Sequence, residues 1–221
     1  MAKGSVTSVP DSSLPILGVL ISGRGSNLQA LIEAINGAQL SARIGVVISN
    51  KPGAAGLERA REAGLETLVV NHRDFSDRNA FDLAVAGELK RRGVGLVCLA
   101  GFMRLIGPQL LEAFPNAILN IHPSLLPSFP GVDAQAQAIA HGVKVSGVTV
   151  HMVTGELDGG PIILQASVPV LDDDTPESLS ARILVQEHRV YPEAVRLVLA
   201  GGWRVEGRRF LATGNTERPE Q

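Results

Sequence analysis

The sequence predicts an α/β protein with a doubly wound, mostly parallel sheet that antiparallel strands extend in the C-terminal half. Two observations predict this class. In the first hundred residues, short apolar runs of strand length alternate with helical segments, as in parallel sheets covered by helices on both faces. After residue 144, two longer strand-like runs follow each other across a turn, as antiparallel neighbours do. The first half thus corresponds to a Rossmann-like mononucleotide-binding half.

The elements of the first half each have a local signal. Residues 16–21 are continuously apolar, and after a glycine-rich turn apolar residues recur at helical spacing between 28 and 35. We expect the remaining strands at 43–49, 68–70 and 96–100 and the remaining helices at 54–63 and 78–92. The last of these helices carries Phe81, Val85 and Leu89 on one stripe, which predicts the face that packs on the sheet.

The second half contains the expected antiparallel extension. We expect strands at 117–122, 145–153 and 162–170, a short helix at 133–141, a long helix from about 175 to 199 and a terminal hairpin around 206–207. Thr175 is the predicted N-cap of the long helix. The chain is expected to form a single domain over 16–212, with a disordered leader at 1–15 and a polar tail at 213–221.

Composition excludes several classes of protein. Of the 221 residues, 45% are hydrophobic and 19% charged, an ordinary globular balance. The net charge of −2 gives no reason to expect a nucleic acid or a membrane as partner. Cys98 is the one cysteine, so no internal disulfide can form. The leader also lacks a signal-peptide core, and we expect a cytoplasmic location.

The segment 120–127, Asn-Ile-His-Pro-Ser-Leu-Leu-Pro, is the first candidate site. Asn120 and His122 lie two apart and share one face if the strand continues through them. An amide can donate to a developing oxyanion and an imidazole can move a proton near neutral pH, which suits acyl transfer. The structural alternative is a strand end with a buried, hydrogen-bonded Asn and His.

Three further loops could contribute. Residues 23–27, Gly-Arg-Gly-Ser-Asn, precede the first helix and favour a monophosphate ligand at its N-terminus, or else form only a tight turn. The apolar loop 101–107 suits a flat aromatic ligand, although it could equally pack into the core. The turn 156–161 contains Asp158, which would hold the imidazole of His122 if the turn folds back onto it.

A metal site is not expected. The five histidines show no helical i, i+3 or i+4 spacing and have no cysteine partner. His151 lies in the middle of a predicted strand, and we interpret it as a hydrogen-bonded core residue.

Taken together, the motifs resemble those of the phosphoribosylglycinamide formyltransferases of purine biosynthesis. The resemblance covers residues 16–211 and rests on ISGRGSNLQA at 21–30, AGFMR at 100–104, NIHPSLLP at 120–127 and ELDGGPI at 156–162. It implies transfer of a formyl group from 10-formyltetrahydrofolate to the amino group of glycinamide ribonucleotide, without a metal.

The resemblance also implies roles for single residues. Gly25, Ser26 and Asn27 would bind the substrate phosphate, and Glu187 the ribose hydroxyls. Met103, Arg104, Leu105 and Ile106 would line the folate pocket, with Arg78 nearby.

In the chemical step, Asn120 would donate to the formyl oxygen of the cosubstrate. His122 would be the proton donor, and Asp158 would keep it charged. Asp133 stands where many relatives carry His, so we expect no catalytic role there.

Three alternatives remain to be separated by experiment. Formyltetrahydrofolate deformylase gives the formyl group to water, but the expected leader leaves no room for the regulatory domain that usually precedes it. Methionyl-tRNA formyltransferase carries an additional C-terminal domain for which this chain ends too soon. The third alternative is a non-catalytic phosphate- or folate-binding module.

Overall fold

The computed structural model describes residues 14–212. Of the predicted leader, only residues 14 and 15 fall inside this range, and the predicted tail lies outside it. The strands are β1 Ile16–Ile21, β2 Arg43–Ser49, β3 Thr67–Val69, β4 Leu96–Leu99, β5 Ile118–His122, β6 Val145–Met152, β7 Ile162–Pro169, β8 Trp203–Glu206 and β9 Arg209–Ala212. The helices are α1 Ser26–Asn36, α2 Gly56–Glu62, α3 Arg78–Arg91, α4 Pro108–Ala113, α5 Ala134–Ala140 and α6 Pro176–Ala200, and His72–Asp74 forms a 3₁₀ turn, η1.

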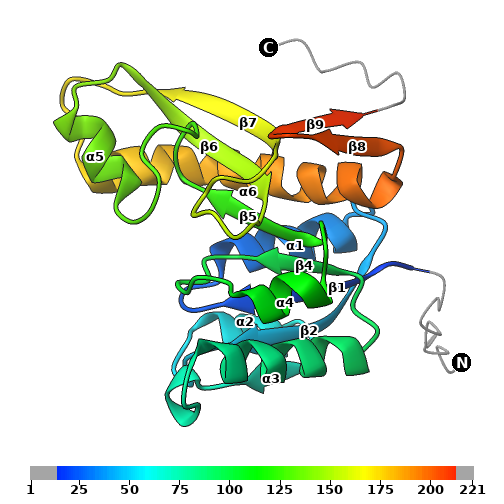
Figure 1. Cartoon of the computed structure of the whole chain (residues 1–221). Coiled ribbons are helices and arrows are strands. Elements are labelled where there is room, and N and C mark those ends of the chain that lie inside the picture. Colours follow the sequence, from blue (N-terminus) through cyan, green and yellow to red (C-terminus); the bar gives the residue numbers. More distant parts are fainter. Residues whose placement is uncertain (1–13, 213–221) are drawn as a thin grey trace, which may run out of the picture.

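These strands join into one sheet with the order β3-β2-β1-β4-β5-β6-β7-β9-β8 (Figure 1). The five strands from β3 to β5 are parallel neighbours. β6 and β7 continue the sheet in antiparallel fashion from β5. The predicted fold class is therefore confirmed, and the change of direction occurs at the strand that carries Asn120 and His122.

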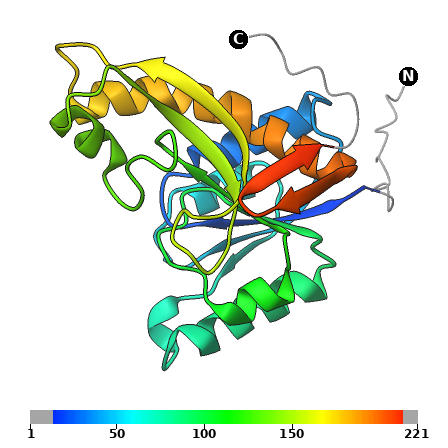
Figure 2. The ribbon, with the colours of Figure 1, turned by 45° about the horizontal axis from the view of Figure 1, so that its top comes forward.

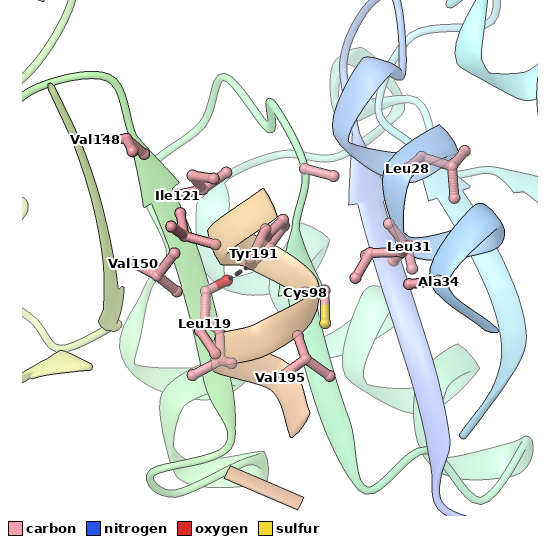
Figure 3. Packing of buried hydrophobic residues seen from close by; sticks show 14 of the residues in the cluster. Leu28, Leu31, Ala34, Cys98, Leu119, Ile121, Val148, Val150, Tyr191 and Val195 are labelled. Carbon is pink, nitrogen blue, oxygen red and sulfur yellow. Dashed lines mark hydrogen bonds between the residues drawn. The ribbon is translucent and has the colours of Figure 1, made fainter. Parts of the chain in front are cut away.

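Helices cover both faces of the parallel part. Buried side chains of α1, α2 and α6 belong to one hydrophobic cluster, and those of α3 and α4 belong to a second. Figures 1 and 2 show α3 and α4 on the side of the sheet opposite α1 and α6. On the first side, Tyr191 of α6 lies among Cys98 of β4 and Leu119 of β5 (Figure 3).

The predicted element bounds agree with the structure to within two residues, but α4 and η1 were not predicted. α4 has only six residues, which is too short for a helical period to show in the sequence. Its Pro108 occupies the first turn, a position where the missing N–H costs nothing. Thr175 caps α6 as predicted, because its side chain accepts from the backbone N–H of Ser178.

No helix in the described part of the chain is both long and apolar enough to cross a bilayer. The cytoplasmic location stays a prediction.

Candidate active site

The carboxyl ends of β1, β4 and β5 meet at one edge of the sheet, because these strands are parallel neighbours. The loops that follow them are those that the sequence analysis selected. Asn120 and His122 belong to the last residues of β5. Two prolines, Pro123 and Pro127, then prevent the chain from continuing as a ladder strand.

His122 is held from both sides of its ring. Its Nε2 lies 2.8 Å from the carbonyl oxygen of Phe129, so that nitrogen carries a hydrogen and donates it. Its Nδ1 lies 3.5 Å from Oδ2 of Asp158, and the two side chains are only 6% and 8% exposed. The predicted contact between residues 36 positions apart in the chain is therefore present.

Asp158 is a shared acceptor at this site. Its Oδ2 also accepts the backbone N–H of Gly131 at 2.8 Å. Burial by itself raises the pKa of Asp158, but the His151 imidazole, the Gly131 N–H and the His122 imidazole outweigh burial and hold the pKa below its usual value. The carboxyl group is therefore ionised at neutral pH and can stabilise positive charge on an imidazole.

His151 belongs to the same cluster as Asn120, His122 and Asp158. The sequence analysis missed this and interpreted His151 only as a core residue. It is buried, as expected of a core residue, but it is also the cross-strand neighbour of Asn120. Its Nε2 lies 3.2 Å from Nδ2 of Asn120 and 3.6 Å from Oδ1 of Asp158. The ring nitrogen Nδ1 lies 2.9 Å from the carbonyl oxygen of Met152. With the hydrogen on Nδ1 alone, Nε2 accepts one N–H of Asn120 and leaves the second for a ligand. When Nε2 is protonated as well, its N–H faces the carboxylate of Asp158 and lowers the pKa of that group.

The glycine turn after β1 places the N-terminus of α1 at the same edge. Gly25 is the N-cap residue with φ of 74°, a left-handed conformation that favours glycine. A Cβ there would lie 2.7 Å from the Cα of Gly56, so the two backbones require glycine to pack this closely. No side chain caps this end of α1, and the N–H groups at Ser26 and Asn27 point outward from the helix start.

Asn27 and Glu187 form a pair that links α1 to α6. The amide Nδ2 of Asn27 donates to Oε2 of Glu187 at 2.6 Å, so the side chain of Asn27 is already engaged. Burial raises the pKa of Glu187, although Asn27 and the charge of Arg24 oppose the rise. Oδ1 of Asn27 is buried without a partner among the described residues.

The loop after β4 presents apolar side chains to solvent. Met103 is 70% and Leu105 51% exposed, whereas Ile106 packs against the cluster of α3 and α4. Arg104 stacks over the ring of Phe81 with its Cζ 5.1 Å from the ring centroid. Arg78 is the first residue of α3. Its side chain lies beside the end of this loop, because a Cβ added to Gly107 would be 3.2 Å from Cδ of Arg78.

Ser22 is a second residue that the sequence analysis missed. Its hydroxyl accepts the backbone N–H of Met103 at 2.8 Å and donates to Oδ1 of Asn50 at 2.6 Å. The loops after β1 and β4 are thereby tied together. The signals in the sequence are its place directly after a buried strand and its position in the motif at 21–30.

Asp133 is exposed and lies at the start of α5 with φ of 55°. It makes no side-chain cap there. Among the described residues, no group of three or more His, Cys, Asp or Glu side chains could hold a metal ion.

Comparison with known proteins identifies the family. The formyl transferase family model matches residues 17–195. The chain belongs to the formyl transferase family.

This formyl transferase is 45% identical over 190 residues to phosphoribosylglycinamide formyltransferase of Escherichia coli K12, covering 86% of this chain and 87% of the relative. It is 48% identical to the human trifunctional purine biosynthetic protein adenosine-3 over 84% of this chain, which spans only 18% of that relative. The crystal structure of glycinamide ribonucleotide transformylase 1 from Symbiobacterium toebii is 55% identical with a TM-score of 0.90, covering 91% of this chain and 95% of that one. These similarities confirm the resemblance derived from the sequence motifs.

Proposed function

We propose that this formyl transferase moves the formyl group of 10-formyltetrahydrofolate to the amino group of glycinamide ribonucleotide. One observation carries the proposal: an amide and an imidazole of β5 meet an ionised carboxylate of the turn between β6 and β7 at the sheet edge, in the cluster Asn120, His122 and Asp158. Similar proteins are named for this activity. The phosphate would bind at the N-terminus of α1 with Gly25, Ser26 and Asn27, which favours an anion.

The reaction needs a site that is more complementary to an oxyanion than to a carbonyl. The substrate amine attacks the formyl carbon, and the formyl oxygen becomes negative in a tetrahedral intermediate. The free N–H of Asn120 and a hydrogen of protonated His122 stabilise that charge. Loss of one such donor typically costs roughly 3–4 kcal/mol of transition-state stabilisation.

A proton must also move while the carbon–nitrogen bond to the folate breaks. The amine loses one proton, and the departing folate nitrogen gains one. Nε2 of His122 already donates to Phe129, so Nδ1 is the nitrogen that exchanges the proton. The 3.5 Å between Nδ1 and Asp158 is longer than a good hydrogen bond and leaves that N–H available to substrate or water.

The remaining site residues would bind the two substrates. Glu187 would accept hydrogen bonds from the ribose hydroxyls. Met103, Arg104, Leu105 and Ile106 would line the pocket of the folate rings, with Arg78 nearby. The exposed apolar surface of Met103 and Leu105 supports this assignment, because such side chains suit a flat aromatic ligand.

The decisive experiment measures formyl transfer and formyl hydrolysis side by side. We expect the wild-type protein to consume 10-formyltetrahydrofolate only when glycinamide ribonucleotide is present. His122→Ala should reduce turnover by about 10²- to 10⁴-fold, the usual contribution of a proton-transfer group. Consumption at the same rate without the amine would indicate a deformylase. Binding of both substrates without turnover would indicate a non-catalytic module.

A further inference from the structure

Asp82 is a buried carboxylate behind the loop 101–107, and the proposed mechanism does not use it. It lies in the second turn of α3 and is 1% exposed. A buried carboxylate is costly unless it is hydrogen-bonded or paired with positive charge. The contacts of Asp82 therefore indicate what it stabilises.

The strongest contact of Asp82 is with the end of the loop. Its Oδ2 accepts the backbone N–H of Gly107 at 2.6 Å. Burial raises the pKa of Asp82, while the Gly107 N–H and the charges of Arg78 and Arg104 oppose that rise. Oδ1 of Asp82 and Nε of Arg104 are both buried without a partner among the described residues.

The same part of α3 contacts the loop at two more points. Phe81 stacks on Phe102 with ring centroids 6.4 Å apart, and Arg104 lies over the ring of Phe81. At the other end of the loop, Ser22 holds the N–H of Met103. The backbone is thus hydrogen-bonded at both ends, while the side chains of Met103 and Leu105 between them remain exposed.

We propose that Asp82 is a positioning residue for the cosubstrate loop: by holding Gly107, it fixes the loop in the shape that receives the folate rings. The inference rests on the proposed function, because it assumes that this loop binds the cosubstrate. A loop ordered before binding loses less conformational entropy when the ligand arrives. A hydrogen bond to an ionised carboxylate is also stronger than one to a neutral acceptor.

The test separates the two substrates. We expect Asp82→Ala to raise KM for 10-formyltetrahydrofolate about tenfold, an effect of ordinary size for one charged hydrogen bond. KM for glycinamide ribonucleotide should stay within about twofold, because Asp82 contacts the loop 101–107 and not the residues 25–27 proposed to bind the phosphate. Asp82→Asn keeps an acceptor for Gly107 and should show a smaller rise. Equal increases for both substrates, or none, would overturn the inference.

Gly107→Ala tests the contact from its other side. Gly107 has φ of −94°, which alanine adopts without strain, but a Cβ there would lie 2.6 Å from Oδ2 of Asp82. We expect Gly107→Ala to raise KM for the folate in the wild-type background and to add little in the Asp82→Ala background. Additive effects of the two changes would contradict a shared contact.

Val85→Ala is the matched control for helix stability. Val85 is fully buried and belongs to the same hydrophobic cluster as Phe81, one turn earlier in α3. It makes none of the contacts with the loop 101–107 that are described above. It should lower the melting temperature and leave both KM values unchanged. A selective rise in KM for the folate with Val85→Ala would show that any weakening of α3 has this effect, and the role of Asp82 would be rejected.

A binding measurement keeps the inference separate from the proposed activity. Calorimetric titration with a non-reactive folate analogue, in which carbon replaces the formyl-bearing nitrogen, measures the affinity of the cosubstrate site without any chemical step. Weaker binding to Asp82→Ala than to wild type supports the inference. Equal binding to both rejects it even if the wild-type protein transfers the formyl group. Absence of that transfer by the wild type would instead reject the proposed function.

Discussion

Asp158 has a backbone conformation that few residues other than glycine adopt. Its φ is 49°, in the left-handed region that most residues with a Cβ avoid and that Asp adopts more readily than most. The turn comes close to β6, since a Cβ on Gly160 would lie 1.8 Å from the carbonyl oxygen of Met152. This close packing helps to hold the carboxylate against His122 and His151.

The first prediction concerns the charge of Asp158. Asp158→Asn keeps the size of the side chain but cannot stabilise a protonated His122. We expect kcat to fall by about 10² or more, because proton transfer is impaired, with both KM values nearly unchanged. Steady-state kinetics with each substrate varied in turn provides the measurement. A large rise in KM with kcat preserved would show that Asp158 binds substrate.

The second prediction concerns His151. His151→Phe fills the buried space but removes the Nε2 atom that faces Asn120. The amide of Asn120 would then lose the partner that orients it, and we expect kcat to fall by about 10- to 100-fold, as misplaced catalytic groups do. Circular dichroism should show an unchanged fold. Unaltered kcat in a folded variant would mean that His151 only fills the core.

At the scale of elements, α6 connects the proposed substrate site to the strands that hold the proposed catalytic residues. Glu187 and Tyr191 lie four residues apart in this helix and therefore on one face. Glu187 pairs with Asn27 of α1. The hydroxyl of Tyr191 donates to the carbonyl oxygen of Leu99 at 2.9 Å and lies 3.3 Å from that of Leu119, the residue before Asn120 (Figure 3).

The third prediction tests this attachment. Tyr191 is fully buried, so Tyr191→Phe leaves two buried carbonyl oxygens without this donor. We expect the free energy of unfolding to fall by about 1–3 kcal/mol, the cost of an unsatisfied buried group. Urea denaturation measures the change. The melting temperature should fall by several degrees, and KM for both substrates should change little. A variant as stable as wild type would show that the hydroxyl contributes nothing to the fold.

At the scale of the whole molecule, the buried carboxyl group of Glu187 reduces the stability of the fold at neutral pH. Burial raises the pKa of Glu187 above its ordinary value of 4.5. As the pH rises from this value, the unfolded chain loses the proton first, and the free energy of unfolding falls until the folded protein has lost it too. The buried carboxylate is therefore destabilising above its folded pKa and neutral below 4.5.

The fourth prediction follows from that sign. Glu187→Gln keeps an acceptor for Asn27 but has no proton to lose. It should be more stable than wild type near pH 8, and the difference should shrink as the pH falls toward about 5. KM for glycinamide ribonucleotide should rise if Glu187 binds the ribose hydroxyls as proposed, because the neutral amide accepts hydrogen bonds more weakly than the carboxylate. Denaturation curves across this pH range, with the exposed Glu33→Gln as control, provide the test. A difference that is constant with pH would contradict the linkage.

The sequence by itself predicted the order of the elements apart from α4 and η1, the four candidate site segments and the family. These features depend on local patterns: runs of apolar residues set the strands, and turn residues set the loops between them. The parallel arrangement follows from the same patterns, since strands that are apolar throughout must be covered on both sides. The predicted proximity of Asp158 to His122 came from the family resemblance and is present in the structure.

Only the tertiary structure decided which side chains support the site. His151 faces Asn120 because of the register between β5 and β6. A long connection that contains α5 joins these strands, so no hairpin turn fixes their register in the sequence. Asp82 lies in α3, 25 residues before Gly107, and accepts its backbone N–H. The sequence analysis predicted that only the apolar residues of this helix, Phe81, Val85 and Leu89, pack on the sheet. Such contacts arise when distant segments pack, so spacing along the chain cannot reveal them.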